Sequence, residues 1–404
     1  MQIYPRILHG YQMNLKGLAR NVIMLGLVSF FSDLSTEMIT PVLPLFLVGV
    51  LGASYVLVGL IEGSADFLIG MLKFISGWYS DKMGRRKPFI VLGYLSGAFV
   101  KPMLGLAQAP LHYMGLRLAE RAGKGIRGTP RDALIVDSVD KSVLGRAFGF
   151  RSMMDTSGAI AGAVSSLVLV AVLVGEPSSV YRTMFVISAL PAFISGALAL
   201  VVVKEVKRTL KVNKKSFFAG LKSFDGKLKF FIFTVGVFSL GNFTLAFFIL
   251  RAKALGIPDS QTVLLFLLFN IVYAAAAIPF GELSDKIGRR KVVSLGFAIF
   301  SLACLGFAFS ADIVQIAVSF AVYGLFMGVF GGVPQAYVSE IAVQEYKATA
   351  LGVQATVSAV LTLASSVIGG FLWDSFGASA VFGYGATMGL VALVLFGLGS
   401  RFRN

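Results

Sequence analysis

The chain has 404 residues, of which 56% are hydrophobic and only 14% are charged, and its formal net charge is +16. About a quarter of the residues of an ordinary soluble domain are charged, so this composition excludes a soluble globular protein. In a soluble chain such a positive charge would indicate nucleic-acid binding. Here much of it lies between apolar segments, where membrane topology explains it, and we expect no nucleic-acid partner.

Few residues suit catalysis or metal binding. The chain contains one cysteine, Cys304, and two histidines, His9 and His112. These numbers exclude an internal disulfide, a cysteine metal site and a histidine cluster. A phosphate-binding Gly-x-x-x-x-Gly-Lys-Ser/Thr loop is absent, as is a serine paired with a histidine within one apolar segment. We therefore expect no enzymatic activity, no cofactor and no bound metal.

Apolar runs separated by charges or turn residues predict an all-α membrane protein with twelve spans. A helix needs about 20 apolar residues to cross a hydrocarbon layer ~30 Å thick. In chain order the predicted spans are 20–50, 55–80, 88–108, 111–137, 146–174, 180–203, 229–252, 260–283, 292–310, 313–339, 349–373 and 378–400.

The basic residues between the spans predict the orientation of the chain. Nine of the 36 Lys and Arg residues lie between positions 204 and 229, and others cluster at 82–87, at 286–291 and at both termini. With twelve spans all of these segments face one side. Because basic loops stay on the cytoplasmic side, both termini are expected in the cytoplasm.

The chain repeats itself. The segment from Gly77 to Lys87, GWYSDKMGRRK, recurs from Gly281 to Lys291 as GELSDKIGRRK, with eight identical residues at an offset of 204. Each copy follows the second span of its half. The predicted organisation is therefore six spans in residues 1–203, a basic cytoplasmic linker at 204–228, and six spans in residues 229–404.

Both copies resemble the loop signature of the major facilitator superfamily, Gly-x-x-x-Asp-x-x-Gly-Arg-Arg/Lys. The resemblance covers the whole chain. It implies two six-helix bundles related by pseudo-two-fold symmetry around a midplane cavity, and transport by rocking of the two halves. It also implies a monomer in the inner, cytoplasmic membrane whose partners are the lipid bilayer, a small-molecule substrate and protons. Further segments, such as Asp33 to Pro41 and Arg121 to Asp132, resemble prokaryotic permeases of unassigned substrate.

The repeated loop is a candidate conformational gate. A carboxylate at the end of a span can cap a neighbouring helix and pair with arginine, and in the family this loop is thought to hold the cytoplasmic side closed. Glycine would allow close helix approach. The alternative is that the arginines only determine topology. The gate candidates are Gly77, Asp81, Arg85, Gly281, Asp285 and Arg289.

Charged residues inside spans are costly, so each one is a functional hypothesis. Nearly all lie in the first half. Asp33 and Glu37 are four residues apart in span 1, and Glu62 and Asp66 are four apart in span 2, so each pair shares a helical face. The segment that begins at Arg121 resembles a span 4 signature of the family, Arg-x-x-x-Gly-x-x-x, in which the arginine is associated with proton transfer, although Lys124 and Arg127 replace residues that are usually neutral. The proton-coupling candidates are Asp33, Glu37, Glu62, Asp66, Arg121 and Asp155.

Span 4 carries a basic stripe, formed by Arg117, Arg121, Lys124, Arg127 and Arg131. At 100° per residue these five positions fall within an arc of about 120°. A stripe facing lipid would be very unfavourable, so it should face other helices or a watery cavity. Three interpretations remain open, namely a structural salt-bridge lattice joining spans 1, 2, 4 and 5, proton coupling, and direct binding of an anionic substrate. The last would use Lys124, Arg127, Arg131 and Arg151.

The second half offers aromatic and amide side chains in place of charges. Walls of this kind suit an amphipathic organic molecule. The substrate-binding candidates here are Asn242, Phe247, Asn270 and Tyr273. In span 5, Gly149, Gly158 and Gly162 partly resemble a signature of proton-exchanging exporters, although close helix packing explains them equally. We predict a proton-coupled exporter of a small organic compound; the alternative is uptake or exchange of an anion bound by the basic stripe.

Overall fold

The computed structural model describes residues 19–140, 143–206 and 224–399, and these residues form helices and no strands. The first half contains α1 (Arg20–Ile39), α2 (Leu43–Gly49), α3 (Tyr55–Met83), α4 (Lys87–Leu104), α5 (Pro110–Ser138), α6 (Leu144–Val172) and α7 (Pro177–Val201). The second half contains α9 (Gly226–Ser239), α10 (Ala246–Ala254), α11 (Asp259–Ile287), α12 (Arg289–Phe309), α13 (Ile313–Phe330), α14 (Val333–Ile341), α15 (Lys347–Phe376) and α16 (Ala378–Leu398). Most of the predicted linker, from 207 to 223, lies outside the described residues.

Taken with their continuations, these helices make twelve spans, as predicted. Within the described ranges, nine are long and apolar enough to cross a membrane by composition. The other three are α4, α5 and the pair α9 and α10. Helix α5 carries the basic stripe, α4 is made more polar by Lys87 and Lys101, and α9 and α10 have 14 and 9 residues. These segments are held in place by helices packed against them, such as α3 and α4 against α5.

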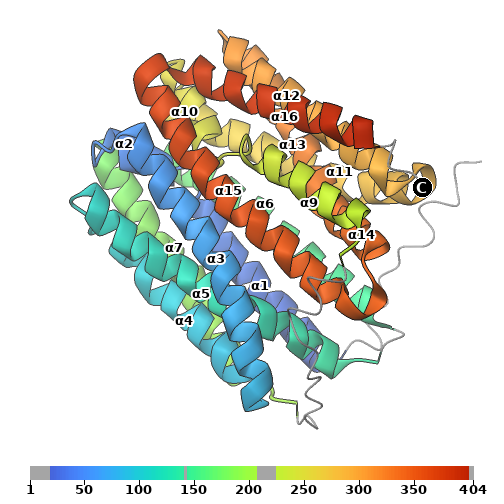
Figure 1. Ribbon diagram of the computed structural model, residues 1–404. Coiled ribbons are helices and arrows are strands. Elements are labelled where there is room, and N and C mark those ends of the chain that lie inside the picture. The colour runs from blue at the N-terminus through green and yellow to red at the C-terminus, as the bar shows by residue number, and fades with distance from the viewer. Residues whose placement is uncertain (1–18, 141–142, 207–223, 400–404) are drawn as a thin grey trace, which may run out of the picture.

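The two halves are related by pseudo-two-fold symmetry (Figure 1). In the first half α1 packs on α6 and α7, α4 on α5 and α7, and α3 on α5. The equivalent contacts recur in the second half, where α9 packs on α15 and α16, α12 on α13 and α16, and α11 on α13. Contacts between the halves obey the same symmetry, since α3 on α15 corresponds to α11 on α6. The chain is thus two copies of one six-span bundle.

Spans 1 and 7 are interrupted, which the prediction of continuous helices at 20–50 and 229–252 missed. Helix α1 ends at Ile39 and α2 begins at Leu43, while α9 ends at Ser239 and α10 begins at Ala246. Proline has no backbone N–H and disfavours helix in the residue before it, and Pro41 lies in the first interruption. The offset of 204 residues carries Pro41 to Leu245, inside the second interruption, so both breaks occupy equivalent positions.

The halves are closest at the end of the molecule where α3 begins and α15 ends, which we call the far end. The opposite end, which carries both copies of the repeated loop, is called the basic end. A Cβ atom added at Gly59 would lie 2.0 Å from the Ser366 carbonyl oxygen, whereas one added at Gly70 would lie 3.8 Å from the Ala359 Cβ. The two helices therefore separate towards the basic end, as Figure 1 also shows.

Polar contacts between the halves lie at the far end. The Asp374 carboxylate of α15 accepts hydrogen bonds from the backbone N–H groups of Tyr55 and Val56, at 3.1 and 3.0 Å. These are among the first N–H groups of α3, which have no partner within their own helix. Nearby, the Tyr181 hydroxyl donates to the Asp259 carboxylate. The far end is thus closed by contacts that link one half to the other.

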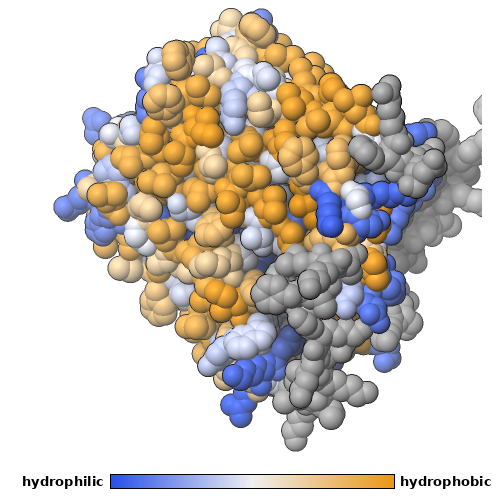
Figure 2. All heavy atoms as spheres, in the orientation of Figure 1, coloured by the Kyte–Doolittle hydropathy of each residue, from blue (hydrophilic) through white to orange (hydrophobic). Residues whose placement is uncertain are grey.

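Large apolar side chains cover the outside of the bundle. Phe74, Leu92, Phe99 and Phe309 are each more than half exposed. Figure 2 shows a face dominated by apolar side chains, with hydrophilic ones gathered at the left margin and at the lower right. An exposed apolar band between two polar margins is the surface that a bilayer requires. The described chain is accordingly a multi-pass membrane protein.

Candidate functional site

A cavity of about 260 Å³ lies between the two halves. From the first half it is lined by Thr36, Glu37, Thr40, Leu43, Pro44, Glu62, Asp66, Arg117 and Arg121, and from the second by Thr244, Leu245, Ala246, Ile249, Phe266, Phe269, Asn270, Tyr273 and Met327. The charged side chains therefore belong to one wall, and the aromatic ones to the other.

The interruptions of spans 1 and 7 both open onto this cavity. Thr40 lies within the first interruption and Leu43 directly after it, and Thr244 and Leu245 lie within the second. An interrupted helix leaves backbone groups without intrahelical partners, and within a membrane such groups are tolerated where they face protein or a watery cavity. Paired broken helices that line a cavity between two repeats are typical of substrate sites in transporters.

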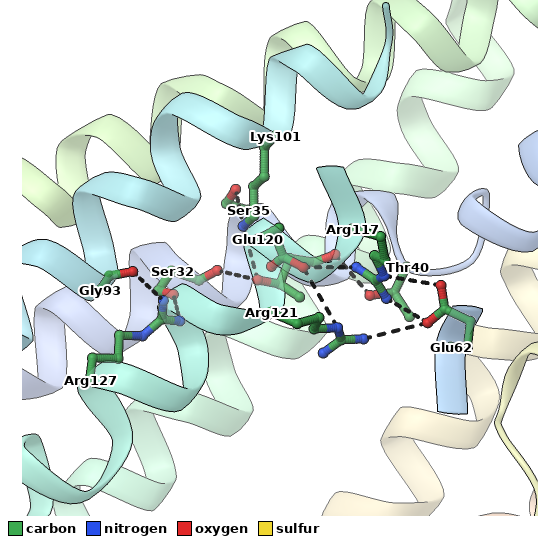
Figure 3. A network of polar contacts seen from close by, with 11 residues as sticks. Ser32, Ser35, Thr40, Glu62, Gly93, Lys101, Arg117, Glu120, Arg121 and Arg127 are labelled. Carbon is green, nitrogen blue, oxygen red and sulfur yellow. Dashed lines mark hydrogen bonds and ion pairs between the residues drawn. The ribbon is translucent and has the colours of Figure 1, made fainter. Parts of the chain in front are cut away.

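Arg117 of α5 is the centre of a buried ion cluster (Figure 3). It is 1% exposed. Its guanidinium donates two hydrogen bonds to Glu62 of α3, at 3.0 and 2.8 Å, and one to Glu120, at 2.9 Å. Arg121 lies 3.9 Å from Glu62 and 3.6 Å from Glu120. Two arginines and two carboxylates make this cluster electrically neutral.

Arg121 is held more loosely than Arg117. Its distances to both carboxylates exceed the range of a charge-assisted hydrogen bond. Its Nε atom is buried and has no hydrogen-bond partner among the described residues. Arg121 is therefore the basic group of the cavity wall that is most available to a ligand.

Further along the basic stripe, arginines are bound by polar groups of the first half. Arg127 donates to the Ser32 hydroxyl at 2.7 Å and to the Gly93 carbonyl at 3.1 Å, and its guanidinium lies 4.2 Å from the centre of the Tyr94 ring. Arg131 donates to the Tyr94 hydroxyl at 3.4 Å. The structure thus places Arg127 and Arg131 among α1, α4 and α5, and neither lines the cavity.

Arg151 of α6 joins the end of the stripe. It lies 3.2 Å from Asp132 of α5 and donates to Asp155 at 2.8 Å, while Arg131 also contacts Asp132 at 3.2 Å. Ion pairs among the described residues hence join spans 2 and 4 and spans 4 and 5. Span 1 is joined through hydroxyl groups, and Asp33 makes no ion pair within 4 Å in the described ranges.

Two carboxylates in the cavity wall are not paired. Glu37 and Asp66 line the cavity, and neither has an ion-pair partner within 4 Å in the part of the chain that the structure describes. Lys124 is likewise without an ion pair there, and it is not among the residues that line the cavity. These two acids can therefore exchange a proton without breaking an ion pair, which Glu62 cannot.

The four candidates of the second half occupy different environments. Asn270 and Tyr273 line the cavity. Phe247 is fully buried, and its ring is stacked against that of Trp373 with the ring centres 5.7 Å apart, so it belongs to the core. Asn242 follows the end of α9 and is not among the residues that line the cavity. The amide and hydroxyl groups that could reach a substrate are those of Asn270 and Tyr273.

In the first copy of the repeated loop, Asp81 is contacted by Arg86 and not by the gate candidate Arg85. Arg86 is 5% exposed and lies 2.5 Å from Asp81 and 3.6 Å from Asp137 of α5. Arg85 is exposed. A Cβ atom at Gly77 would lie 2.7 Å from Thr129, so the expected close approach of helices is present there.

The second copy is more open. Asp285 lies 3.3 Å from Arg289, which also lies 3.2 Å from Glu340 of α14. A Cβ atom at Gly281 would meet nothing within 4 Å. The expectation of close helix approach at Gly281 is therefore wrong for this conformation: α5, which packs on Gly77, is continuous, whereas its counterpart in the second half is interrupted between the end of α13 and the start of α14.

Several hydroxyl groups at the site were missed by reasoning from charge alone. Thr36, Thr40 and Thr244 line the cavity. Buried Lys101 of α4 donates to Ser35 and Thr36, at 2.7 and 2.9 Å, and was not among the candidates. The threonine hydroxyl often bonds to its own helix backbone, so only Pro41, close to Thr36 and Thr40, could have drawn attention to this region, and Thr244 has no proline near it.

Glycines of span 5 pack against span 1. A Cβ atom at Gly158 would lie 2.4 Å from the Phe30 carbonyl oxygen, and one at Gly162 would lie 2.5 Å from that of Leu34. At Gly149 nothing lies within 4 Å. Close packing through small residues accounts for two of the three glycines, so this pattern gives no independent support to export.

Comparison with known proteins identifies the family. The family model described as Major Facilitator Superfamily matches residues 25–249 and 230–402. An uncharacterised MFS-type transporter of Methanocaldococcus jannaschii is 38% identical over 388 residues, which cover 95% of each chain. The multidrug resistance protein MdtH of Escherichia coli O1:K1 is 30% identical over 141 residues, 35% of this chain and 33% of that one.

Solved structures agree on the fold. The nucleoside transporter NupG has a TM-score of 0.77 at 14% identity, covering 95% of this chain and 99% of that one. A bacterial homologue of the human lysosomal transporter Spinster, inward-facing and occupied, also has a TM-score of 0.77, at 15% identity, covering 94% and 96%. The expectation of a transporter rather than an enzyme is confirmed. The chain belongs to the major facilitator superfamily and is a secondary transporter.

Proposed function

We propose that this transporter exports a small amphipathic organic compound, uncharged or cationic, in exchange for protons. It does so as a monomer in the inner membrane, with the basic end in the cytoplasm, because basic loops are retained on that side. The observation that carries the proposal is the cavity between the halves, which has an acidic wall on one side and an aromatic wall on the other.

The two walls suit a molecule with two kinds of surface. Phe266, Phe269 and Tyr273 offer apolar faces that bind rings and alkyl groups. The opposite wall contains three carboxylates and two arginines. Because Arg117 and Arg121 are together neutralised by Glu62 and Glu120, the charge available to a ligand on that wall is mainly that of Glu37 and Asp66. An amine or an uncharged polar group fits there better than an anion.

Glu37 and Asp66 are the proton carriers in this proposal. A carboxylate without an ion pair, at the edge of an apolar cavity, binds a proton or a cationic substrate in turn. Competition between the two ligands couples them, since the substrate leaves when the proton arrives. Glu62 has a structural role and does not carry the proton, because protonating it would leave the buried charge of Arg117 with one carboxylate partner fewer.

Alternating access follows from the two-fold arrangement. The halves meet at the far end and diverge towards the basic end, so the cavity is reached from the proposed cytoplasmic side. Rocking of the halves would close the basic end, where Asp81 and Asp285 occupy equivalent positions, and open the far end. The repeated loops act as the gate of that second conformation.

Anion transport is the second candidate function, and Arg121 is the residue that favours it. Its ion pairs with Glu62 and Glu120 are loose, at 3.9 and 3.6 Å, which leaves its guanidinium able to bind a carboxylate or phosphate. In this alternative Arg121 binds the substrate with Lys124. Arg127, Arg131 and Arg151 contribute less than the sequence predicts, because each is already bound by protein groups.

The test is flux in proteoliposomes containing the purified full-length protein. Tetraphenylphosphonium, a neutral aromatic compound and an organic anion are each assayed with and without an imposed pH gradient. Export predicts that the cation or the neutral compound moves, that the gradient accelerates it, and that Glu37→Gln or Asp66→Asn removes the acceleration. Glu176→Gln is the matched control, since Glu176 is an exposed acid outside the cavity. Movement of the anion alone, abolished by Arg121→Gln, would establish the alternative.

A further inference from the structure

A groove of about 630 Å³ lies on the outside of the first half at the basic end. It runs between the start of α4 and the end of α7, which pack against each other at the lower left of Figure 1. Arg85, Lys87 and Glu205 line its outer end, and Val91, Leu95 and Leu200 line the part within the membrane. The groove is separate from the cavity between the halves.

The polar end of the groove carries positive charge that no ion pair in the described ranges neutralises. The Glu205 carboxylate accepts hydrogen bonds from the backbone N–H groups of Arg86 and Lys87, at 2.9 to 3.0 Å, and so caps α4. The side chains of Arg85 and Lys87 make no ion pair within 4 Å in the described ranges, whereas Arg86 between them is buried on Asp81. The two free cations therefore face outwards while the arginine between them faces inwards.

The inner part of the groove is apolar and open to the bilayer. Leu92 and Leu200, which belong to its lining, are 57% and 51% exposed. Val91 and Leu95 are four residues apart and share one face of α4. A ligand that satisfies both parts of the groove needs an anionic head at the membrane boundary and a hydrocarbon chain beside it.

We propose that this groove binds one anionic phospholipid from the leaflet at the basic end. The headgroup phosphate lies between Arg85 and Lys87, since cations at a membrane boundary attract anionic headgroups. One acyl chain lies along Val91, Leu95 and Leu200. A soluble phosphate ion would use the cations but would leave the apolar wall unfilled, so the shape of the groove favours a lipid. The inference does not depend on which substrate is carried.

Binding here would act on the repeated loop. The lipid contacts residues on either side of Arg86, and Arg86 joins the loop to Asp81 of α3 and Asp137 of α5. A bound headgroup would restrain the connection between α3 and α4 without touching the cavity. The phospholipid composition of the membrane thereby becomes a regulator of the gate.

The experiment is native mass spectrometry of the detergent-purified full-length protein, titrated with palmitoyl-oleoyl phosphatidylglycerol or with the phosphatidylcholine of the same chains. We expect wild type to retain one phosphatidylglycerol in preference to phosphatidylcholine. Each basic residue near a membrane surface contributes roughly a fivefold factor, so Arg85→Gln with Lys87→Gln should weaken binding about 25-fold. Lys286→Gln with Lys291→Gln, which makes the same charge change on the second loop, should not.

Three results would overturn the proposal. Equal retention of the two lipids by wild type would show that the groove does not distinguish an anionic headgroup from a zwitterionic one. An equal loss in the two double variants would show a general effect of surface charge. Displacement of the lipid by millimolar inorganic phosphate would show that the cations bind free anions and that the apolar wall is unused. The first and third results need no variant, so they stand even if a substitution impairs folding.

Discussion

Replacing Asp374 by alanine should shift the balance between the two conformations of the transporter. The Asp374 carboxylate accepts two backbone hydrogen bonds from the first turn of α3, at 3.1 and 3.0 Å. It lies in the last turn of α15, where the helix dipole disfavours a negative charge. The carboxylate is thus favourable only while the far end is closed and α3 is beside it.

The size of the shift follows from that geometry. Losing a helix cap costs about 1 kcal/mol, and losing a negative charge beside the N-terminus of α3 costs the closed state roughly 0.3–1 kcal/mol more. Because Asp374 is exposed, both contributions are at the lower, water-screened end of their ranges. The closed far end should therefore lose about 1 kcal/mol, which changes the ratio of the two conformations roughly fivefold.

Distances between spin labels measure this ratio. Cys304 is the only cysteine of the chain and is buried, so labels can be placed after a Cys304→Ser substitution. Leu111 of α5 and Leu264 of α11 are 69% and 50% exposed near the far end. In the Asp374→Ala variant the population with the longer distance between these positions should grow.

Asp312 provides the matched control. Its carboxylate also accepts two backbone hydrogen bonds from a helix start, those of Val314 and Gln315 at 2.9 Å, but within the second half alone. Asp312→Ala should cost stability without changing the distance distribution. The reasoning is refuted if Asp374→Ala leaves the distribution unchanged, or if both variants shift it equally.

Three further substitutions test other contacts. Gly370→Val should disfavour the closed far end, because its Cβ would lie 2.3 Å from the Tyr55 carbonyl oxygen; the spin-label distances report this, and an unchanged distribution would contradict it. Glu62→Gln should destabilise the protein by about 2 kcal/mol, because Arg117 keeps a buried charge with only one carboxylate beside it; thermal unfolding in detergent measures it, and a melting temperature equal to wild type would argue against the buried cluster. Tyr273→Leu should raise the KM for flux several-fold at unchanged melting temperature, since the ring lines the cavity; an unaffected KM would remove it from the site.

Much of the fold could be predicted because it depends on composition and repetition. Membrane spans follow from the length of apolar runs, and the 204-residue repeat determines how the spans divide. The interruptions of spans 1 and 7 could not be read in the same way, because they lie inside apolar runs. Pro41 disfavours helix locally, yet span 6 contains Pro191 in a continuous helix. Tertiary packing decides between the two outcomes.

At the site, too, the sequence predicts some features, and tertiary packing decides the others. The 3.6-residue period placed the basic stripe on one face of α5, but it could not say which cation each neighbouring helix neutralises. Arg85 and Arg86 are adjacent in sequence, and only the packing of α3, α4 and α5 shows that Arg86 is the buried one. Phe247 and Tyr273 are both aromatic residues of the second half, and only the fold places one in the core and the other at the cavity.

The internal repeat also relates the two walls of the cavity. Adding 204 carries Thr40 to Thr244, Glu62 to Phe266 and Asp66 to Asn270, and all six residues line the cavity.

The two halves thus line the cavity at equivalent positions, and at two of these three positions the first half has a carboxylate where the second half has an uncharged side chain. Under the proposed function, such a cavity would bind an unsymmetrical molecule in a single orientation, with its polar end towards the first half. Asn270→Asp, which replaces an amide by a carboxylate of the same shape, would restore a matching acid across the cavity and allow the molecule to bind either way round.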